Sequence, residues 1–259
     1  MPGAERSMRI SDLYVYPVKS CGGQARDGVF LDTMGVIDDR RYLLVDALAR
    51  AVTQRAVPRL ATLRPRVEGG VLVLATSGRE LARIAPEEFR SAELDVSVLG
   101  RRARGIPAPP YFNEILAGAF DEDLRLVRLA PRAAASFVDD APLLVGSRAS
   151  LDVLNSRLST PIGMERFRPN LVIEGSTPFA EHDWRRLQIG MVELAQRGPC
   201  ERCTVITVDQ ASGRSAGPEP LRTLARFRGT EREAIFGAYF DVIVPGMLTA
   251  GAPVLAASS

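Results

Sequence analysis

Lysine, histidine and cysteine are scarce in this sequence of 259 residues. Of its 33 basic residues only Lys19 is a lysine, and His182 is the one histidine. A histidine-rich zinc or iron site is therefore excluded, and a Ser-His-Asp hydrolase would depend on His182 alone. Three cysteines are too few for a disulfide framework, which favours a cytoplasmic protein with reduced thiols.

Long apolar runs and a large net charge are missing as well. No stretch approaches the roughly 18 consecutive apolar residues of a membrane-spanning helix, and the first residues lack the apolar core of a secretory signal. The net charge of +2 gives no reason to expect nucleic-acid binding. With 46% hydrophobic and 25% charged residues, the chain has the composition of a globular protein. We therefore expect neither a membrane nor a nucleic acid as a partner.

Apolar runs of strand length, separated by glycine and proline turns, dominate the pattern of the chain. Strands are predicted at residues 10–18, 41–46, 71–75, 93–99, 124–129, 170–174, 184–189, 191–195, 204–208, 239–244 and 254–257. Helices are predicted at residues 111–120, 147–158 and 220–228. Because strands and helices do not alternate regularly, the predicted fold class is mainly β with a few helices (α+β), with barrel-like or sandwich sheets. Residues 105–110 and 131–142 are the candidate domain boundaries.

The strongest local feature is the Cys-x-x-Cys sequence within residues 198–209, GPCERCTVITVD. A zinc knuckle there would need Cys21 and His182 to complete four ligands. A thioredoxin-type pair needs a helix after its first cysteine, whereas the run TVITV predicts a strand. Two buried, inert cysteines are a third interpretation. The fourth is a thiolate that binds a soft metal or carries sulfur, with Arg197 and Arg202 favouring its ionised form.

A second segment, residues 16–23 with the sequence YPVKSCGG, ends a predicted strand in a glycine-containing turn. This turn presents Lys19 and the hydroxyl of Ser20, and its backbone N–H groups can add to them. Such a turn suits an anionic ligand. A polar hairpin turn without a ligand is the alternative interpretation.

Two more segments place polar groups beside predicted strands. Asp39 can orient Arg40 toward a ligand, or the two can form a surface ion pair. In residues 166–173, Asn170 carries both a donor and an acceptor, which suits the edge of a heterocycle, although a solvated loop is equally consistent. We interpret His182, which lies in a polar turn, as a residue that is either structural or supports a site residue from behind.

Taken in order, these segments resemble one known family. The chain carries YPVKSCGG, DRRYLLVD, TQRAVPRL, GSRASLDVLNSRL, FRPNLVIEG and PCERCTVITVDQASG, followed by EPLRTLARFR and FGAYFDVIV. This series is similar to the MOSC family over residues 8–257, and most of all to mitochondrial amidoxime-reducing components and bacterial YcbX-like proteins. The resemblance implies a MOSC N-terminal β-barrel-like domain at residues 8–125 and a MOSC β-barrel domain at residues 126–258.

The resemblance also implies a ligand, the molybdenum cofactor, which is a pterin with a dithiolene and a phosphate. Cys203 matches the cysteine whose thiolate binds the metal in the reductase branch, so it is the predicted metal ligand and catalytic residue; Cys200 matches a second cysteine that is not a ligand. Cations and N–H donors suit the anionic phosphate. Ser147 would act through backbone donors at a helix start, and Asp209 either tunes the site or closes a turn. The predicted cofactor-binding residues are Lys19, Ser20, Arg40, Ser147, Arg168, Asn170 and Asp209.

For function, the resemblance implies a molybdenum-dependent oxidoreductase that reduces N-hydroxylated compounds such as amidoximes, hydroxylamines or N-oxides. YcbX-like proteins carry a [2Fe–2S] domain, but this sequence has no further cysteines for an iron–sulfur cluster. We therefore expect electrons from a separate electron-transfer protein, and we expect no pyridoxal phosphate. The alternative is a sulfur carrier, or a protein for sulfuration or storage of the molybdenum cofactor, that uses Cys203.

Overall fold

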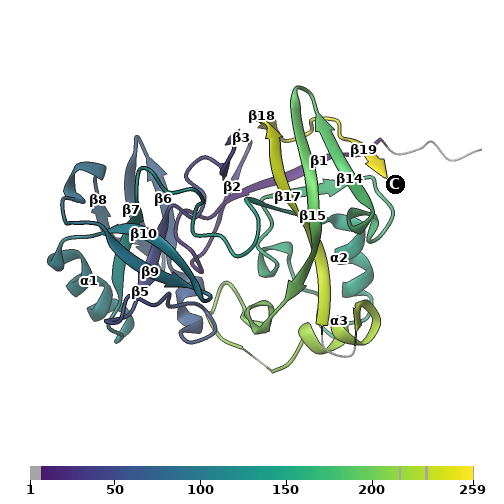
Figure 1. Cartoon of the computed structure of the whole chain (residues 1–259). Coiled ribbons are helices and arrows are strands. Elements are labelled where there is room, and N and C mark those ends of the chain that lie inside the picture. The colour runs from purple at the N-terminus through teal and green to yellow at the C-terminus, as the bar shows by residue number, and fades with distance from the viewer. Residues whose placement is uncertain (1–6, 216, 231–232, 259) are drawn as a thin grey trace, which may run out of the picture.

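The computed structural model describes residues 7–215, 217–230 and 233–258 and consists mainly of strands, which confirms the predicted α+β class (Figure 1). The α-helices in these ranges are α1 (Pro110–Phe120), α2 (Arg148–Asn155) and α3 (Leu221–Arg228). The strands are β1 (Arg9–Val15), β2 (Gln24–Arg26), β3 (Gly28–Asp32), β4 (Gly35–Val36), β5 (Tyr42–Val45), β6 (Arg64–Glu68), β7 (Val71–Thr76), β8 (Arg79–Ile84), β9 (Leu94–Val98), β10 (Arg101–Pro107), β11 (Arg125–Leu129), β12 (Leu143–Ser147), β13 (Leu171–Glu174), β14 (Trp184–Ile189), β15 (Val192–Arg202), β16 (Gly229–Thr230), β17 (Glu233–Val244), β18 (Gly246–Thr249) and β19 (Leu255–Ser258).

The first of two lobes, at the left of Figure 1, contains β5 to β11 and α1. Its sheets have the orders β5-β11-β10-β9 and β6-β7-β8. Helix α1 begins at Pro110, directly after the N-cap Pro109, and the left-handed backbone of Asp121 (φ 54°) stops it after Phe120. Phe112, Leu116 and Phe120 recur every fourth residue along α1 and are buried in the core of this lobe.

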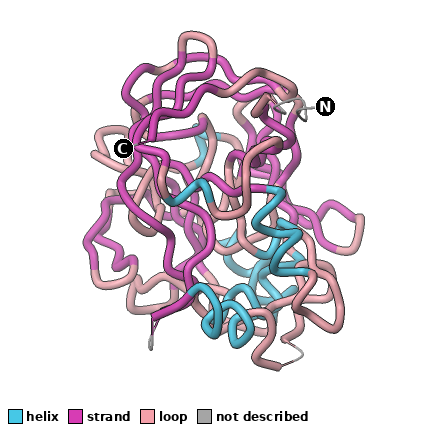
Figure 2. Tube along the Cα trace, turned by 90° about the vertical axis from the view of Figure 1, so that its right-hand side faces the viewer, coloured by secondary structure: helices cyan, strands magenta, loops and turns pink. Residues whose placement is uncertain are grey.

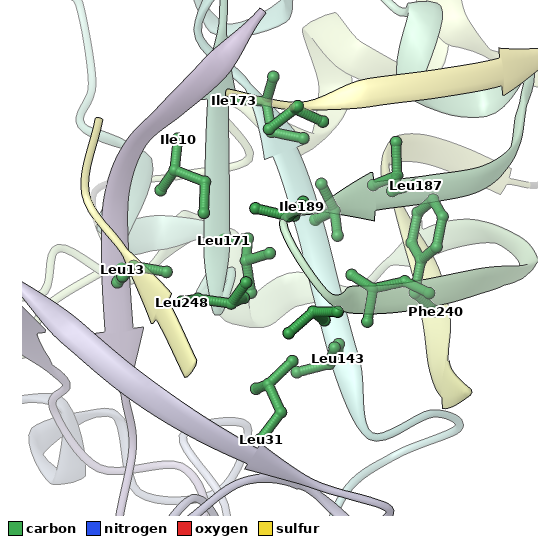
Figure 3. Close-up of a cluster of buried hydrophobic side chains, with 14 of the residues drawn as sticks. Ile10, Leu13, Leu31, Leu143, Leu171, Ile173, Leu187, Ile189, Phe240 and Leu248 are labelled. Carbon is green, nitrogen blue, oxygen red and sulfur yellow. The ribbon is translucent and has the colours of Figure 1, made fainter. Parts of the chain in front are cut away.

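The second lobe is built on a nine-stranded sheet with the order β19-β14-β15-β17-β12-β13-β1-β2, and β16 pairs with β17 beside this path. β12 and β13 run parallel, while the other neighbours along this path run antiparallel. Figure 3 shows its buried core, where Leu13 of β1, Leu143 of β12, Leu171 of β13 and Phe240 of β17 point toward one another. Helices α2 and α3 belong to this lobe, and Figure 2 shows most of its helical turns below the strands.

The N-terminal strands lie in the second lobe, although the chain then passes into the first. Strand β1 pairs with β13, with Leu13 opposite Leu171. Strand β3 pairs with β18, with Phe30 opposite Met247. The start of the chain therefore helps to build the sheet that the C-terminal half completes. The division into domains at residues 8–125 and 126–258 stays a prediction.

The predicted strand at residues 204–208 is wrong. Strand β15 ends at Arg202, and a 3₁₀ helix, η5 (Thr204–Thr207), follows it. The turn is closed locally, because the Thr207 hydroxyl donates to the Thr204 carbonyl (2.8 Å) and the Ile206 N–H donates to the Cys203 carbonyl (3.3 Å). Threonine hydroxyl groups can form hydrogen bonds with nearby backbone carbonyls. Here these local hydrogen bonds favour a turn, although the Thr-Val-Ile-Thr-Val run has a high β-propensity.

Residues 131–142 connect the two lobes, and we call this segment the interlobe strap. The Arg101 side chain from β10 donates to the carbonyls of Val138 and Asp139 on the strap. From the other lobe, the Arg197 side chain of β15 donates to the carbonyl of Asp140. Both lobes therefore hold the strap, and this fixes the side chains that it presents.

Candidate functional site

A cavity of about 290 Å³ lies where the two lobes meet. The first lobe contributes Thr53, Arg55 and Leu99, and the strap contributes Val138 to Ala141. The second lobe contributes Phe167, Tyr239 and others. The structure thus brings together in one cavity six of the residues predicted from the sequence, namely Lys19, Ser20, Arg40, Arg168, Asn170 and Cys203.

The floor of the cavity carries two arginines stacked on one tyrosine. The Arg40 and Arg168 guanidinium carbons lie 4.5 Å and 4.4 Å from the centroid of the Tyr16 ring. Such cation–π contacts strengthen when they are removed from water. Tyr16 is buried, and burial raises the pKa of its hydroxyl group. Burial, with a further contribution from Arg40, lowers the pKa of Arg168 to about 10.

Hydrogen bonds fix the position of Arg40. Its Nη1 donates to Asp39 Oδ2 (2.5 Å) and to Asn170 Oδ1 (3.0 Å), and its Nη2 donates to the Arg168 carbonyl (3.2 Å). Both Arg40 (φ 47°) and Arg168 (φ 57°) have left-handed backbones, which place strain at the floor of this cavity. Asp39 is 2% exposed and also accepts from the Tyr16 N–H (2.8 Å), so the Asp39–Arg40 pair is buried rather than on the surface.

Asn170 lines the cavity, but its side-chain amide forms hydrogen bonds with other groups of the protein. Its Oδ1 accepts from Arg40 and from the Leu144 N–H (3.2 Å), and its Nδ2 donates to the Tyr14 carbonyl (3.3 Å). These bonds tie the floor to strands β1 and β12. The interpretation in which Asn170 reads the edge of a heterocycle stays a prediction, while its support of Arg40 is visible in the structure.

Lys19 and Ser20 lie in the turn after β1, as the sequence predicts. Lys19 is only 6% exposed, and its ammonium forms an ion pair with Asp139 of the strap. Burial lowers the pKa of this ammonium. Ser20 has a left-handed backbone (φ 63°), and its carbonyl accepts from Gln54 Nε2 (2.8 Å), which holds the turn against the first lobe.

Cys203 lies at the rim of the cavity, directly before η5, and is half-buried. Its Sγ accepts a hydrogen bond from Arg55 Nη2 at 3.4 Å. A guanidinium at this distance suits a sulfur that carries negative charge. Arg55 was missed by the sequence analysis as a site residue, although it belongs to the TQRAVPRL segment that supported the family resemblance.

Cys200 differs from Cys203 in its burial and in its place relative to the cavity. It is buried in β15, does not line the cavity, and accepts from Arg202 Nη1 at 2.7 Å. Burial raises the pKa of its thiol, and Tyr239 forms a hydrogen bond with it. Burial also raises the pKa of the Cys21 thiol, to about 12. In the described part of the chain, no three His, Cys, Asp or Glu side chains are grouped to hold a metal ion, as a zinc knuckle requires.

Ser147 and Asp209 do not line the cavity. Ser147 is buried at the start of α2, where its Oγ accepts from the Ser150 N–H (3.5 Å) and contacts Ser176 Oγ (3.0 Å). Asp209 pairs with Arg166 (3.3 Å) and accepts from the N–H and hydroxyl of Ser212, so it closes a turn. Their contact with a cofactor stays a prediction.

His182 belongs to a separate buried polar cluster in the second lobe. Arg228 Nη2 lies 2.6 Å from His182 Nδ1, and burial, together with Arg228, lowers the pKa of His182 to about 4. The neighbouring Glu181 is fully buried and accepts from the Ser150 hydroxyl (2.8 Å). Burial raises the pKa of Glu181 to about 7. The cluster lies apart from the lining of the interlobe cavity, and the role of His182 stays a prediction.

Replacing Glu181 by Gln is expected to make the protein more stable at pH 8 but not at pH 5. The folded protein keeps a proton on Glu181 up to about pH 7, whereas the unfolded chain releases it near the usual value of 4.5. The stability that this group contributes is therefore present below pH 4.5 and is lost as the pH rises through 7. We expect Glu181→Gln to gain about 2 kcal/mol more at pH 8 than at pH 5 in urea unfolding. An equal effect at both pH values would contradict the burial of an ionisable carboxyl group.

Known proteins share this architecture. The family described as "MOSC N-terminal beta barrel domain" matches residues 7–121, and "MOSC domain" matches residues 132–255. The chain is 30% identical over 279 residues to "Mitochondrial amidoxime-reducing component 1" of Mus musculus, covering 95% of this chain and 81% of that protein. The chain belongs to the MOSC-domain family. This confirms the family resemblance found in the sequence.

Two further similarities differ in how much of the other protein the chain covers. "Molybdenum cofactor sulfurase" of Oryza sativa subsp. japonica is 29% identical over 267 residues, covering 90% of this MOSC chain but 32% of that protein. The chain thus spans about a third of that relative. The YUAD protein from Bacillus subtilis, a solved structure, has a TM-score of 0.45 at 11% identity, covering 98% of this chain and 97% of that one. Among the residues that the structure describes, no helix is both long enough and apolar enough to cross a membrane.

Proposed function

We propose that this MOSC protein binds the molybdenum cofactor in the interlobe cavity, with Cys203 as the protein ligand of molybdenum. We further propose that it reduces N-hydroxylated compounds with electrons from a separate electron-transfer protein. One observation carries the proposal. The partly accessible thiol of Cys203 and the buried cations Lys19 and Arg168 line the same cavity, which both lobes build. Amidoxime-reducing components among the relatives support the same reaction class.

The side chains present fit this cofactor chemically. Arg168 is buried and stacked on Tyr16, and its Nη1 donates to the Cys21 carbonyl rather than to a carboxylate (2.5 Å). A buried guanidinium whose partner is neutral favours an anion such as the phosphate of the pterin. Cys203 supplies a soft sulfur ligand at the rim, with Arg55 beside it. Lys19, Ser20 and Arg40 would hold the remaining polar groups of the cofactor.

The bound cofactor would supply two-electron oxygen-atom transfer. The protein would bind the cofactor and the substrate and hold them in the right orientation. Arg55 donates a hydrogen bond to Cys203 Sγ and would hold this sulfur in position as a metal ligand. Tyr239 lines the cavity and keeps its proton, because burial and the nearby Cys200 raise the pKa of its hydroxyl group. Leu99, at the wall of the cavity, is exposed and would offer an apolar contact to part of a substrate.

The decisive experiment is to purify the protein from a molybdenum-replete host and measure molybdenum and pterin. The proposal expects both at one per chain, and turnover of an amidoxime to an amidine when a chemical reductant supplies electrons. Cofactor without turnover would favour a storage protein. A preparation without molybdenum or pterin, from a host that makes the cofactor, would contradict the proposed binding.

A sulfur carrier is the second candidate. It is favoured by the likeness to "Molybdenum cofactor sulfurase" and by the accessibility of Cys203 compared with the buried Cys21 and Cys200. In that case Cys203 would carry a persulfide, and its second sulfur atom would be released by cyanide as thiocyanate. A cyanide-labile sulfur on Cys203, together with no amidoxime turnover, would replace the reductase proposal by this one.

A further inference from the structure

The interlobe strap places one carboxylate directly among the cations of the cavity. Asp139 forms an ion pair with Lys19, the single lysine of the chain. Its carboxylate also interacts electrostatically with the guanidinium groups of Arg40 and Arg55. An anionic ligand that approaches Lys19 therefore meets a negative charge that the protein itself has placed there.

The position of this carboxylate is built into the fold. Arg101 holds the carbonyls of Val138 and Asp139 from the first lobe, and Arg197 holds the carbonyl of Asp140 from the second. Arg197 is itself fixed by a bidentate pair with Asp241, with contacts of 3.1 Å and 2.5 Å. The backbone on both sides of Asp139 is thus anchored, so its side chain cannot leave Lys19 through a simple movement of a free loop.

We propose that Asp139 is a specificity-determining residue that competes with anionic ligands for Lys19. An anion that offers only its charge must displace Asp139 and gains little from the exchange. A larger ligand that also contacts Arg168 and the thiol of Cys203 gains further binding energy and can displace it. Asp139 therefore keeps small free anions out of the cavity and admits a ligand that engages several groups. The identity of that larger ligand rests on the proposed function, whereas the competition for Lys19 does not.

The strap also provides a matched control. Asp140 is the next residue, lines the same cavity and is exposed. Its carboxylate forms no ion pair with the residues that the structure describes, and its backbone carbonyl alone is held, by Arg197. Removing the charge of Asp140 changes the net charge of the cavity by the same amount as removing that of Asp139. Only Asp139, however, contacts Lys19.

The test is a calorimetric titration with inorganic pyrophosphate at low ionic strength. Asp139→Asn is expected to bind pyrophosphate about tenfold more tightly than the wild type, which corresponds to about 1.4 kcal/mol. Asp140→Asn is expected to remain within about twofold of the wild type. In Asp139→Asn combined with Lys19→Gln, the gain should disappear, because the cation that Asp139 released is gone. Asp139→Ser serves as the second variant if the asparagine variant does not fold.

Several outcomes would overturn the proposal. Unchanged or weaker binding by Asp139→Asn would show that Asp139 only positions Lys19, and no binding by any variant would show that there is no anion binding for Asp139 to oppose. Equal gains in Asp139→Asn and Asp140→Asn would indicate a general charge effect, and a gain that survives Lys19→Gln would place the competition elsewhere. Molybdenum and pterin measured in the same preparations separate this result from the proposed function. A protein without pterin can still show the pyrophosphate difference.

Discussion

Cys203→Ala is expected to lose its bound molybdenum and to lower amidoxime turnover more than about 100-fold, since even outer partners of metal ligands cost about 10–100-fold when removed. The reason is that Cys203 is the cysteine that lines the cavity, with Arg55 Nη2 3.4 Å from its sulfur. The measurements are the molybdenum content of the purified variant and its turnover with a chemical reductant.

Cys200→Ala is the matched control, because the two cysteines are three residues apart and differ in burial. Cys200 is 1% exposed, accepts from Arg202 Nη1 and lies outside the lining of the cavity. We expect this variant to retain molybdenum and most of its turnover, and to lose about 1–3 kcal/mol of stability because a buried guanidinium loses a partner. Equal loss of turnover in both variants would contradict Cys203 as the ligand and would favour a role for both thiols.

Elements with strong local signals were predictable from the sequence. The helix predicted at residues 111–120 agrees closely with α1, whose buried apolar residues recur at helical spacing within one segment. The strand at residues 204–208 was predicted wrongly, since threonine hydroxyls that bond to nearby carbonyls are not visible in a pattern of β-branched residues. Strand β15 was predicted too short, because Gly198 and Pro199 suggested a turn where the structure has an irregular strand.

The site was only partly predictable, for a similar reason. Lys19, Arg40 and Cys203 lie in recognisable segments, and the fold brings these segments together. Asp139 was not predicted, because its partner is 120 residues away in the chain and no spacing rule connects them. The stacking of Arg40 and Arg168 on Tyr16 escaped prediction as well, since it depends on how strand β1 meets the loop before β13. Contacts that arise from packing of distant segments leave no local pattern.

Arg40→Met is expected to destabilise the protein by about 3–5 kcal/mol, because it leaves the buried carboxylate of Asp39 without its cation. Asp39 would then keep the bond from the Tyr16 N–H, while the 2.5 Å contact to the guanidinium would be lost. Methionine preserves most of the side-chain volume, and its backbone cost at φ 47° resembles that of arginine. The measurement is urea unfolding followed by circular dichroism.

Two controls separate the ion pair from a general loss of packing. Asp39→Asn combined with Arg40→Met should recover most of the lost stability, because a neutral amide no longer needs the cation. Arg168→Met should lower the stability by less than half as much as Arg40→Met. Arg168 Nη1 donates to the Cys21 carbonyl, so removing the guanidinium leaves no buried carboxylate without a cation. If Arg168→Met were as costly as Arg40→Met, stacking on Tyr16 rather than the Asp39–Arg40 pair would hold the floor together. Arg168 would then be needed for the fold itself, and its positive charge would no longer be free to select an anionic ligand.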